Sequence, residues 1–347
     1  MAKKILIVNV NWVGDVIFST PFIKALRQAY PDAHIACLVH PRCVEVLKGN
    51  PRLDEIIVYC EEGAHKTLLG KAGLILNLRS RHFDTAFILH RSFTKALITL
   101  LAGISQRIGY ATKNRSILLT KVVEEPIEEL HKVEYFLNIA RASRLTPVDR
   151  SYEFFIKDED RSFLRDLLIK NGVANGDLMV VICPGGNWDM KRWPAANFAK
   201  LADALIERFG AKVVISGAMR DCSLAGEIEG AMKHKPVTLC GRTTLKSLGA
   251  LLERANLVIA NDTGPMHIAV AMKARVIALF GPTSPKITGP YGTGTYRVIS
   301  RHDSCDIPCY DMTCSENRCM AAISVDDVLK TAEEMITQGS NLKNADR

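Results

Sequence analysis

The stretch that most constrains the fold is a strand-loop-helix-strand sequence in the second half of the chain. Leu257–Ala260 is a short apolar run typical of a buried parallel strand, and the turn-forming residues Asn261–Gly264 end it. Pro265 is favoured in the first turn of a helix, where its missing N–H is no loss. A helix is therefore predicted over 266–274 and a second buried strand over 276–280. Such a β-loop-α-β unit is typical of a parallel sheet covered by helices.

The loop of this unit has the features of an anion-binding site. The amides and the dipole at a helix N-terminus favour a negative charge. Asp262 and Thr263 can cap the helix, Gly264 allows close approach of the backbone, and His267 in the first turn can donate to a phosphate oxygen. The same residues also fit a capped structural helix with a locally satisfied histidine, so the stretch alone leaves both interpretations open.

The composition describes a globular protein of about two domains. The chain has 347 residues, 48% hydrophobic and 24% charged, and a net charge of +8 that favours an anionic partner such as a phosphorylated substrate or a membrane surface. Asn9 and Asn11 interrupt the apolar N-terminal run, so it predicts a first strand and not a signal peptide. No apolar run is long enough to span a bilayer. We therefore expect a cytoplasmic protein with largely reduced cysteines and no nucleic-acid partner.

Strands alternate with helices along both halves of the chain, which predicts doubly wound parallel sheets. The apolar runs and helical patterns predict strands at 4–10, 34–39, 56–59, 83–89, 179–183 and 212–216, and helices at 16–30, 92–101, 194–209 and 245–254.

A connecting helix and an Asn-Gly pair within 149–176 mark a domain boundary. We expect an N-terminal domain at 1–155, a C-terminal domain at 156–321, and a last helix at about 322–340. The predicted fold class is α/β, with two Rossmann-like domains facing a cleft. The first loop contains only Gly14 and no GxGxxG follows either first strand, which disfavours an NAD-binding protein.

Two loops at strand ends carry further candidate residues. Asp15 follows the first strand, where a carboxylate can act as a general base or cap the helix predicted to start at Val16. In the second domain, Gly185 and Gly186 allow close backbone approach, and Lys191 with Arg192 can neutralise a diphosphate. The alternative for the second loop is a solvated basic segment.

The stretch from Arg79 to Lys121 has eight basic residues and one acidic residue, Asp84. Such a stretch is usually a solvated face, but this one lies in the domain that lacks the phosphate loops, so it can also receive a second anionic substrate. No acidic pair forms a dependable DxD motif for a metal-bound diphosphate.

Four cysteines near the end of the chain form the pattern C-x3-C-x4-C-x4-C, which is looser than the CxxC pairs of ordinary zinc sites. They are Cys305, Cys309, Cys314 and Cys319. A structural zinc site, a redox-labile pair and unliganded thiols remain open, and we favour a local structural role over a catalytic one.

Taken together, these residues resemble glycosyltransferase family 9, the ADP-heptose:lipopolysaccharide heptosyltransferases, and within it the heptosyltransferase II branch. The resemblance runs through nearly the whole chain. It is carried by Asn11–Asp15, by Ser92–Ile104 with Arg107 and Gly109, by Pro184-Gly185 with Lys191–Pro194, by Asn261–His267 and by Phe280–Pro285.

The resemblance implies a GT-B fold, with the acceptor in the N-terminal domain, the nucleotide sugar in the C-terminal domain, and a last helix that packs back on the first domain. Asp15 matches the catalytic base and Lys191 the lysine on the donor diphosphate. The donor-binding residues implied are Gly185, Lys191, Arg242, Thr243, Asp262, Thr263, Gly264 and His267. On the acceptor side we assign Trp12, Gly14, Arg91, Lys95 and Arg115. The cysteine cluster carries no role from the family.

The activity implied is transfer of heptose from ADP-heptose to Kdo–lipid A or heptosyl-Kdo–lipid A, with inversion and without a metal. The acceptor is phosphorylated and lies at the inner membrane surface, so the enzyme would be cytoplasmic or peripheral on that membrane. The alternatives are a GT-B transferase for another sugar, a GT-B-like UDP-sugar 2-epimerase, and a non-catalytic ADP-sugar-binding protein, which would not need Asp15.

Overall fold

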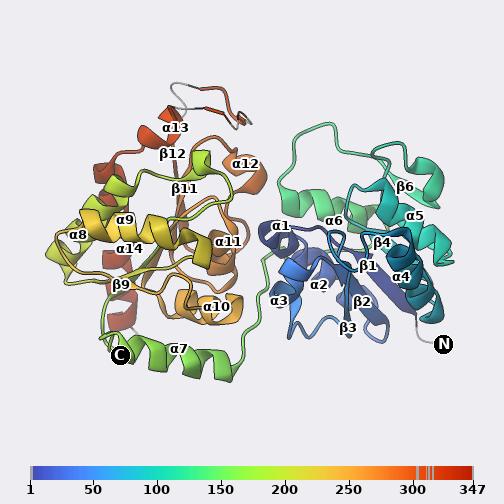
Figure 1. Ribbon diagram of the computed structural model, residues 1–347, viewed down its shortest axis with the longest axis horizontal. Coiled ribbons are helices and arrows are strands. Elements are labelled where there is room, and N and C mark those ends of the chain that lie inside the picture. Colours follow the sequence, from blue (N-terminus) through green and yellow to red (C-terminus); the bar gives the residue numbers. More distant parts are fainter. Residues whose placement is uncertain (1–2, 302–304, 310, 312, 315, 346–347) are drawn as a thin grey trace. The chain divides into compact units, whose positions relative to one another are not determined.

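The computed structural model describes residues 3–301, 305–309, 311, 313–314 and 316–345, with the backbone alone for 339–345. Contacts between Cα atoms divide the chain into two compact units, Met1–Phe155 and Ile156–Arg347, which we call unit 1 and unit 2. Each unit has its own parallel sheet with helices packed against it (Figure 1).

The sheet of unit 1 has six parallel strands within the described residues, in the order β3-β2-β1-β4-β5-β6. The strands are β1 (Lys4–Val8), β2 (His34–Val39), β3 (Glu55–Val58), β4 (Thr85–Ile88), β5 (Gln106–Tyr110) and β6 (Lys121–Val123). The helices are α1 (Val13–Phe18), α2 (Thr20–Ala29), α3 (Val44–Leu47), α4 (Leu68–Ser80), α5 (Phe93–Leu101) and α6 (Lys132–Ala142), with 3-10 turns η1 (Pro41–Cys43) and η2 (Ser116–Leu118).

Helices cover both faces of this sheet, because successive side chains of a strand point to opposite faces. Ala86 and Ile88 of β4 belong to one core cluster with Leu74 and Leu78 of α4 and with residues of α5. Phe87, between them, packs edge-on against Phe22 of α2, and α2 in turn contacts α6. The pair α4–α5 therefore lies on one face and the pair α2–α6 on the other.

The sheet of unit 2 also has six parallel strands in the described part of the chain, in the order β12-β11-β10-β7-β8-β9. The strands are β7 (Met179–Cys183), β8 (Lys212–Ile215), β9 (Val237–Thr238), β10 (Leu257–Asn261), β11 (Val276–Phe280) and β12 (Tyr296–Ser300). The helices are α7 (Asp158–Lys170), α8 (Ala195–Phe209), α9 (Cys222–Ala231), α10 (Leu245–Arg254), α11 (Gly264–Ala271), α12 (Pro285–Thr288), α13 (Arg318–Ala321) and α14 (Val325–Ala345), with 3-10 turns η3 (Asp189–Lys191) and η4 (Met219–Asp221).

The two sheets have the same topology. Numbered within its own unit, each sheet runs third-second-first-fourth-fifth-sixth strand. The strand order reverses between the first and fourth strands, which are β1 and β4 in unit 1 and β7 and β10 in unit 2. In open parallel sheets, ligands bind beyond the carboxyl ends of the strands at this reversal point.

The predicted helix over 16–30 is two helices, α1 and α2, which meet at Ser19. Pro21 has no N–H to donate to the carbonyl of Ile17, so a continuous helix loses a hydrogen bond there. The hydroxyl of Thr20 donates to that carbonyl instead (2.7 Å), and the hydroxyl of Ser19 donates to the carbonyl of Val16 (2.7 Å). The two hydroxyls therefore supply hydrogen bonds to backbone carbonyls where the helix is interrupted.

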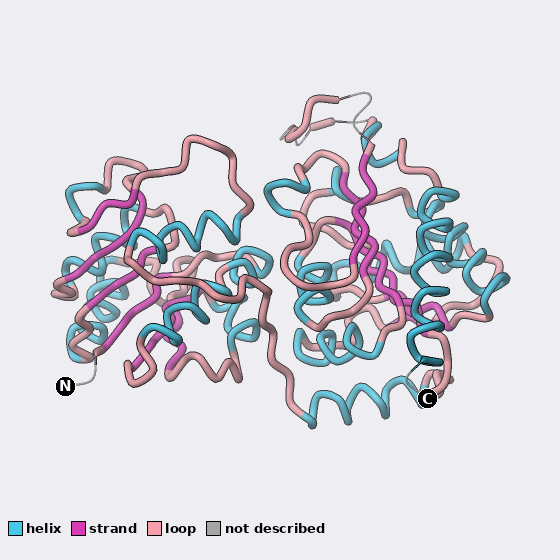
Figure 2. Tube along the Cα trace, turned by 180° about the vertical axis from the view of Figure 1, so that it is seen from behind, coloured by secondary structure: helices cyan, strands magenta, loops and turns pink. Residues whose placement is uncertain are grey.

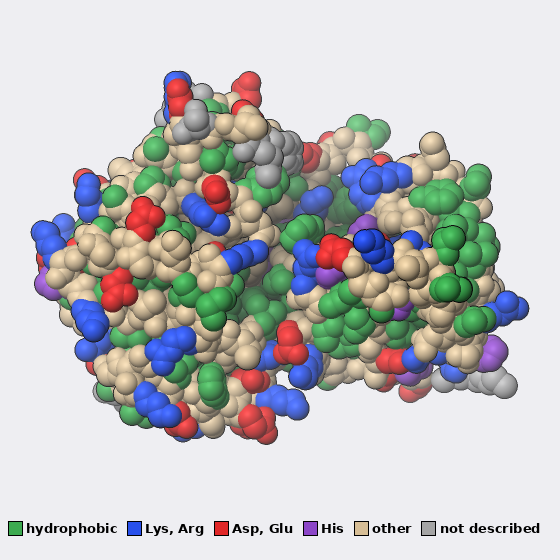
Figure 3. Space-filling model, viewed as in Figure 1, with side chains coloured by type: hydrophobic (Ala, Val, Ile, Leu, Met, Phe, Trp, Pro, Cys, Tyr) green, Lys and Arg blue, Asp and Glu red, His purple; other side chains and the backbone are tan. Residues whose placement is uncertain are grey.

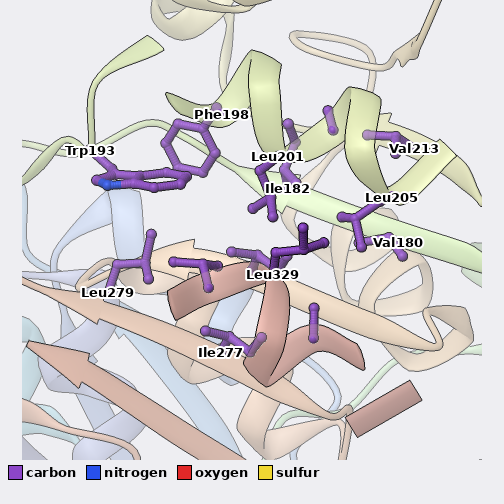
Figure 4. Packing of buried hydrophobic residues seen from close by; sticks show 14 of the residues in the cluster. Val180, Ile182, Trp193, Phe198, Leu201, Leu205, Val213, Ile277, Leu279 and Leu329 are labelled. Atoms are coloured by element: carbon purple, nitrogen blue, oxygen red, sulfur yellow. The ribbon is translucent and has the colours of Figure 1, made fainter. Parts of the chain in front are cut away.

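Trp193 is the largest side chain in the core of unit 2 that is fully buried. Its ring packs edge-on against Phe198 (centroids 4.9 Å apart) and its indole N–H donates to the carbonyl of Ile323 (2.9 Å). Figure 4 shows this pair above Leu279, and Leu329 of α14 belongs to the same cluster. The tryptophan of the basic loop is thus a structural anchor for the loop that carries Lys191.

The last helix, α14, contributes its apolar side to the core of unit 2. Val328, Leu329, Ala332, Met335 and Ile336 belong to that core, and α14 contacts α8 and the strands β10, β11 and β12. Figure 2 shows α14 lying along these strands. The sequence analysis raised packing of this helix on the first domain; the contacts just described all lie within unit 2. None of the helices in the described residues is long and apolar enough to cross a membrane.

Candidate functional site

The candidate site of unit 2 lies at the carboxyl ends of β7 and β10, which are neighbours in the sheet. Asn261, fully buried at the end of β10, donates to the carbonyl of Pro184 (2.8 Å) and accepts from the amide of Trp193 (3.3 Å). A single amide side chain therefore holds both ends of the 184–193 loop against β10.

Lys191 and Asp262 form the central ion pair of this edge, with Lys191 Nζ 2.7 Å from Asp262 Oδ2. The same oxygen accepts the hydroxyl of Thr283 (2.7 Å), and the hydroxyl of Thr288 lies 3.4 Å away. The carboxylate is almost fully buried, whereas the lysine is partly exposed. Asp262 was predicted as a helix cap or donor contact; in the structure it orients the ammonium group of Lys191.

The N-terminus of α11 lies next to this pair. Thr263 is the N-cap residue, but its hydroxyl donates to the carbonyl of Asn261 (3.3 Å) instead of capping the helix, and Gly264 is the first helical residue. His267 is buried in the first turn, with its Nε2 3.8 Å from Asp262 Oδ1. Lys191, Thr263, Gly264 and His267, predicted from two separate stretches, are thus brought together around Asp262.

Asp221 is a member of this edge that the sequence analysis missed. It is buried in η4, after β8, and its Oδ2 accepts the amide of Ala218 (2.9 Å). Among the described residues no donor bonds its buried Oδ1, and Arg220 Nε is 4.0 Å away. A Cβ on Gly185 would lie 2.7–2.9 Å from this carboxyl group, which is closer than carbon atoms approach. Gly185 is therefore needed because Asp221 fills the space beside it.

Two arginines of unit 2 that the sequence analysis considered have partners outside the Lys191–Asp262 pair. Arg192 pairs with Asp189 (2.8 Å) and donates to the carbonyl of Gly186 (3.0 Å), so it stabilises the loop. Arg242 is exposed and donates to Asn171 (3.0 Å), and Thr243 follows it just before α10. The prediction that Lys191 and Arg192 act together on a diphosphate is therefore not supported for Arg192.

In unit 1, a partly buried polar network lies at the carboxyl ends of β1, β3 and β4. Lys95, in the first turn of α5, donates to Asn11 Oδ1 (2.6 Å) and lies 3.7 Å from Glu61 Oε2. Asn11 completes the triangle by donating to Glu61 Oε2 (2.9 Å). The thiol of Cys43 also donates to the carbonyl of Asn11 (3.2 Å). These hydrogen bonds hold Asn11 in place just before α1, the helix that contains Asp15.

Burial lowers the pKa of Lys95 to about 8, and the charge of Glu61 opposes this shift. The neighbouring titratable groups are His90, Tyr59, Cys37 and Cys43. Burial, with the charge of Lys95, lowers the pKa of His90 to about 4, and burial raises the pKa of the Cys43 thiol to about 12. The network is therefore neutral apart from the Lys95–Glu61 pair near pH 7.

Asp15 lies in the first turn of α1, which begins at Val13 and has Trp12 as its N-cap residue. The alternative role of Asp15 as the helix N-cap is therefore wrong. Trp12 is half exposed, and the guanidinium of Arg42 lies 4.7 Å from its ring centroid. Gly14 is within α1, beside Asp15.

Two of the residues predicted to bind an acceptor are internal. Lys95 is only 2% exposed and Arg115 is 0% exposed. The guanidinium of Arg115 donates to the carbonyls of Tyr110 and His90, so it joins the segment after β5 to the loop after β4. Arg91 is exposed and pairs with Glu125 (3.1 Å). The predicted basic stretch is thus partly structural, and Lys95 and Arg115 do not fit direct contact with an acceptor.

Comparison with known proteins decides the family. The family model of glycosyltransferase family 9 (heptosyltransferase) matches residues 72–320, more than half of the chain. The chain belongs to this family.

The family 9 transferase is also similar to individual members over most of its length. It is 28% identical over 300 residues to lipopolysaccharide heptosyltransferase 2 of Escherichia coli K12, covering 83% of this chain and 85% of that protein. The crystal structure of a family 9 glycosyl transferase from Veillonella parvula matches with a TM-score of 0.89 at 27% identity, over 97% of this chain and 98% of the other. The structure of E. coli ADP-heptose lps heptosyltransferase II matches with a TM-score of 0.80 at 26% identity, over 97% and 99%. The predicted fold class, with two doubly wound α/β domains of the GT-B type, is confirmed.

The four C-terminal cysteines of the transferase do not form a zinc site in the structure. In the described part of the chain, no group of three or more His, Cys, Asp or Glu side chains is arranged to hold a metal ion, and Cys305, Cys309, Cys314 and Cys319 are free thiols. The backbone amide of Cys309 donates to the carbonyl of Pro282 (2.7 Å), which ties this segment to the loop after β11. The zinc hypothesis for the cluster is therefore not supported.

Proposed function

We propose that the protein transfers heptose from ADP-heptose to the inner core of lipopolysaccharide, with inversion at the anomeric carbon and without a metal ion. The observation that carries the proposal is the Lys191–Asp262 pair at the N-terminus of α11. The chain that contains this pair is similar, along nearly its whole length, to the E. coli ADP-heptose lps heptosyltransferase II.

Unit 2 would bind the donor. An ammonium group has three N–H donors, so Lys191 can keep its bond to Asp262 and still donate to a diphosphate oxygen. His267 and the first amides of α11 add donors, and the helix dipole favours the negative charge. The lining residues proposed are Gly185, Lys191, Asp262, Thr263, Gly264 and His267. These donors are fixed before the reaction, and such preorganised groups stabilise a departing diphosphate.

The nucleoside part of the donor would lie along the loops after β8 and β9. The unbonded Oδ1 of Asp221 is a buried acceptor that a hydroxyl or amino group of a ligand can satisfy. Arg242 and Thr243 follow β9 at the same edge of the sheet, and we assign them to the adenine side.

Unit 1 would supply the base. The hydroxyl oxygen of the acceptor attacks the anomeric carbon, and the bond from that carbon to the diphosphate oxygen breaks. ADP leaves with the electron pair, and the proton of the hydroxyl passes to Asp15. One displacement of this kind inverts the configuration. Trp12, Gly14 and Arg91 are proposed to meet the acceptor, whereas Lys95 and Arg115 hold the loops in position.

The acceptor proposed is the phosphorylated lipopolysaccharide core at the inner membrane surface, with the protein acting there from the cytoplasm as a peripheral enzyme. No nucleic-acid partner is proposed.

The test is turnover of ADP-heptose with a truncated, soluble core acceptor in the presence of EDTA, measured as release of ADP and as gain of one heptose in the acceptor. The proposal predicts both products in equal amounts. Release of ADP without a glycosylated product, or turnover of a UDP-sugar in preference to ADP-heptose, would contradict it. A thermal-shift panel run in parallel should show stabilisation by ADP greater than by UDP.

A further inference from the structure

Helices α4 and α5 of unit 1 present apolar side chains to solvent. The exposed fractions are 85% for Leu68, 85% for Leu69 and 65% for Leu76 on α4, and 39% for Phe93, 36% for Leu100 and 49% for Leu101 on α5. The two helices contact each other and are neighbours on the sheet. In Figure 3 hydrophobic side chains gather over α4 and α5. We call these six residues the α4–α5 face.

The spacing of these residues shows that they are not stray side chains. Leu68 and Leu76 lie two helical turns apart, and Phe93, Leu100 and Leu101 follow the i, i+7, i+8 positions that share one side of a helix. The opposite side of each helix is already used, because Leu74 and Leu78 of α4 and Ala96 and Ile98 of α5 pack on the sheet. Both helices are therefore apolar on two sides, which is unusual for the surface of a globular protein.

The charge of the same segment is strongly one-sided. Residues 63–123 contain one acidic residue and ten basic residues: Lys66, Lys71, Arg79, Arg81, Arg91, Lys95, Arg107, Lys113, Arg115 and Lys121. Lys95 and Arg115 are buried, and glutamates at 61, 62, 124 and 125 flank the segment. The cations that reach solvent include Lys66, Arg79, Lys113 and Lys121. The acidic residue, Asp84, accepts from the amide of Lys4 (2.7 Å) at the amino end of β1. Lys66 and Lys71 flank Leu68 and Leu69, and both Lys66 and Arg79 are exposed.

We propose that the α4–α5 face docks on a lipid bilayer with anionic headgroups. Apolar side chains flanked by lysine and arginine are the chemistry that such a surface binds, with the apolar groups in the headgroup region and the cations on the phosphates. A second copy of this chain fits less well, because a twofold contact through this face would bring the two basic segments together.

The position of the face also suits the proposed function, on which this part of the inference rests. Phe93 begins α5 directly after the loop that leaves β4, and Leu68 begins α4 after the loop that leaves β3. Both lie at the carboxyl edge of the sheet, where the Asn11–Lys95–Glu61 network holds the loop of Asp15. A lipid-linked acceptor rising from a bilayer on this face therefore meets the edge that carries the proposed base.

The test is co-sedimentation with vesicles of phosphatidylethanolamine and phosphatidylglycerol, compared with vesicles of phosphatidylcholine alone. The wild-type protein should bind the anionic vesicles, and added salt should weaken the binding because it screens the charges. The double variant Leu69→Glu/Leu101→Glu should lower the bound fraction about tenfold or more, since it removes two apolar anchors and adds repulsion. Lys66→Glu/Lys71→Glu should weaken binding to the anionic vesicles alone.

The matched control is Phe163→Glu/Ile169→Glu on α7 of unit 2, where two apolar side chains that are also exposed, by 51% and 58%, are changed in the same way. It should bind vesicles as the wild type does. Circular dichroism and the Tm should show that all variants fold, and turnover with the soluble acceptor should stay at the wild-type level.

The inference is overturned if the wild type does not sediment with anionic vesicles, or if the control loses as much binding as Leu69→Glu/Leu101→Glu. It is also overturned if light scattering shows a dimer that this variant dissociates. If the wild-type protein turns over the soluble acceptor but does not bind the anionic vesicles, the docking face alone is contradicted and the proposed function stands.

Discussion

The two units have one topology, and in each a polar bridge joins the loop after the first strand to the segment after the fourth. In unit 1 the bridge is Lys95 Nζ to Asn11 Oδ1 (2.6 Å), and in unit 2 it is Lys191 Nζ to Asp262 Oδ2 (2.7 Å). The lysine comes from the fourth-strand side in unit 1 and from the first-strand side in unit 2. The same fold position has thus been used for two different tasks.

The surroundings of the two lysines explain the difference. Lys95 is enclosed, and its pKa is lowered to about 8 by burial, so it serves to hold a loop. Lys191 is partly exposed, beside glycine-containing loops and the N-terminus of α11, so it can reach a ligand while Asp262 orients it. The shared topology therefore places a polar bridge at the reversal point of each sheet. Burial decides whether the lysine of the bridge holds a loop, as Lys95 does, or can reach a ligand, as Lys191 can.

The largest expected effect comes from Asp15→Asn, which tests whether the edge of unit 1 takes part in the chemistry. Asparagine keeps the size of the side chain but removes the proton acceptor. We expect turnover with the soluble acceptor to fall by about 10²–10⁴, with the Tm close to the wild-type value. Steady-state assays of ADP release measure the change. Turnover near the wild-type level would make Asp15 a structural residue of α1.

Lys191→Ala tests the lysine of unit 2 and should lower turnover by about 10²–10³, the usual effect of removing one group that stabilises developing charge. It also leaves Asp262 without its main cation. The double variant Lys191→Ala/Asp262→Asn is therefore the control, because it removes the uncompensated carboxylate. Similar turnover in the single and double variants would assign the loss to Lys191 itself. Recovery to the wild-type rate in the double variant would show that Lys191 only neutralises Asp262.

Lys95→Met tests the bridge of unit 1 through its pH dependence. Burial lowers the pKa of Lys95 from its ordinary value of 10.5, which applies in the unfolded chain, to about 8 in the folded protein. Between these values the unfolded chain binds more protons, so the contribution of Lys95 to the free energy of unfolding rises with pH. From pH 8 to pH 10, the Tm of the wild type should therefore rise relative to that of Lys95→Met. The rise should be about 2–4 °C for each ~1 kcal/mol added to the free energy of unfolding. Parallel Tm curves between pH 8 and pH 10 would contradict the lowered pKa, since the neighbouring His90, with a pKa of about 4, and Cys43, with a pKa of about 12, do not titrate in this range.

Much of the fold could be predicted because apolar runs and their polar ends are local signals. The strands over 34–39, 179–183 and 276–280 and the helix over 245–254 have the predicted bounds. Helix α4 was missed because its leucines face both the core and solvent, so they show no helical period on one side.

The sequence analysis predicted many of the residues of the site, but few of the contacts between them. Thr263, Gly264 and His267 follow a strand end, and this local pattern is visible in the sequence. The bond between Lys191 and Asp262 joins residues 71 positions apart, and the contact of Asp221 with Gly185 depends on the pairing of β7 with β8. Contacts of this kind arise from the tertiary fold and leave no mark in the local pattern.

The smallest expected effect is that of Cys309→Ser in the segment after β12. The described contact of Cys309 is made by its backbone, which serine keeps. We expect unchanged turnover and a free energy of unfolding within about 0.5 kcal/mol of the wild-type value. Denaturant unfolding and the turnover assay check this. Loss of turnover in a variant of wild-type stability would give the thiol a role in the chemistry.

The proposed division of tasks, with the donor on unit 2 and the base on unit 1, can be tested by the affinity for ADP, measured by calorimetry in EDTA. We expect Asp15→Asn to bind ADP as the wild type does and Lys191→Ala to bind it about 10–100-fold more weakly, in keeping with the loss of a charged hydrogen bond. Equal weakening in both variants, or unchanged affinity in Lys191→Ala, would contradict the division of tasks between the two units.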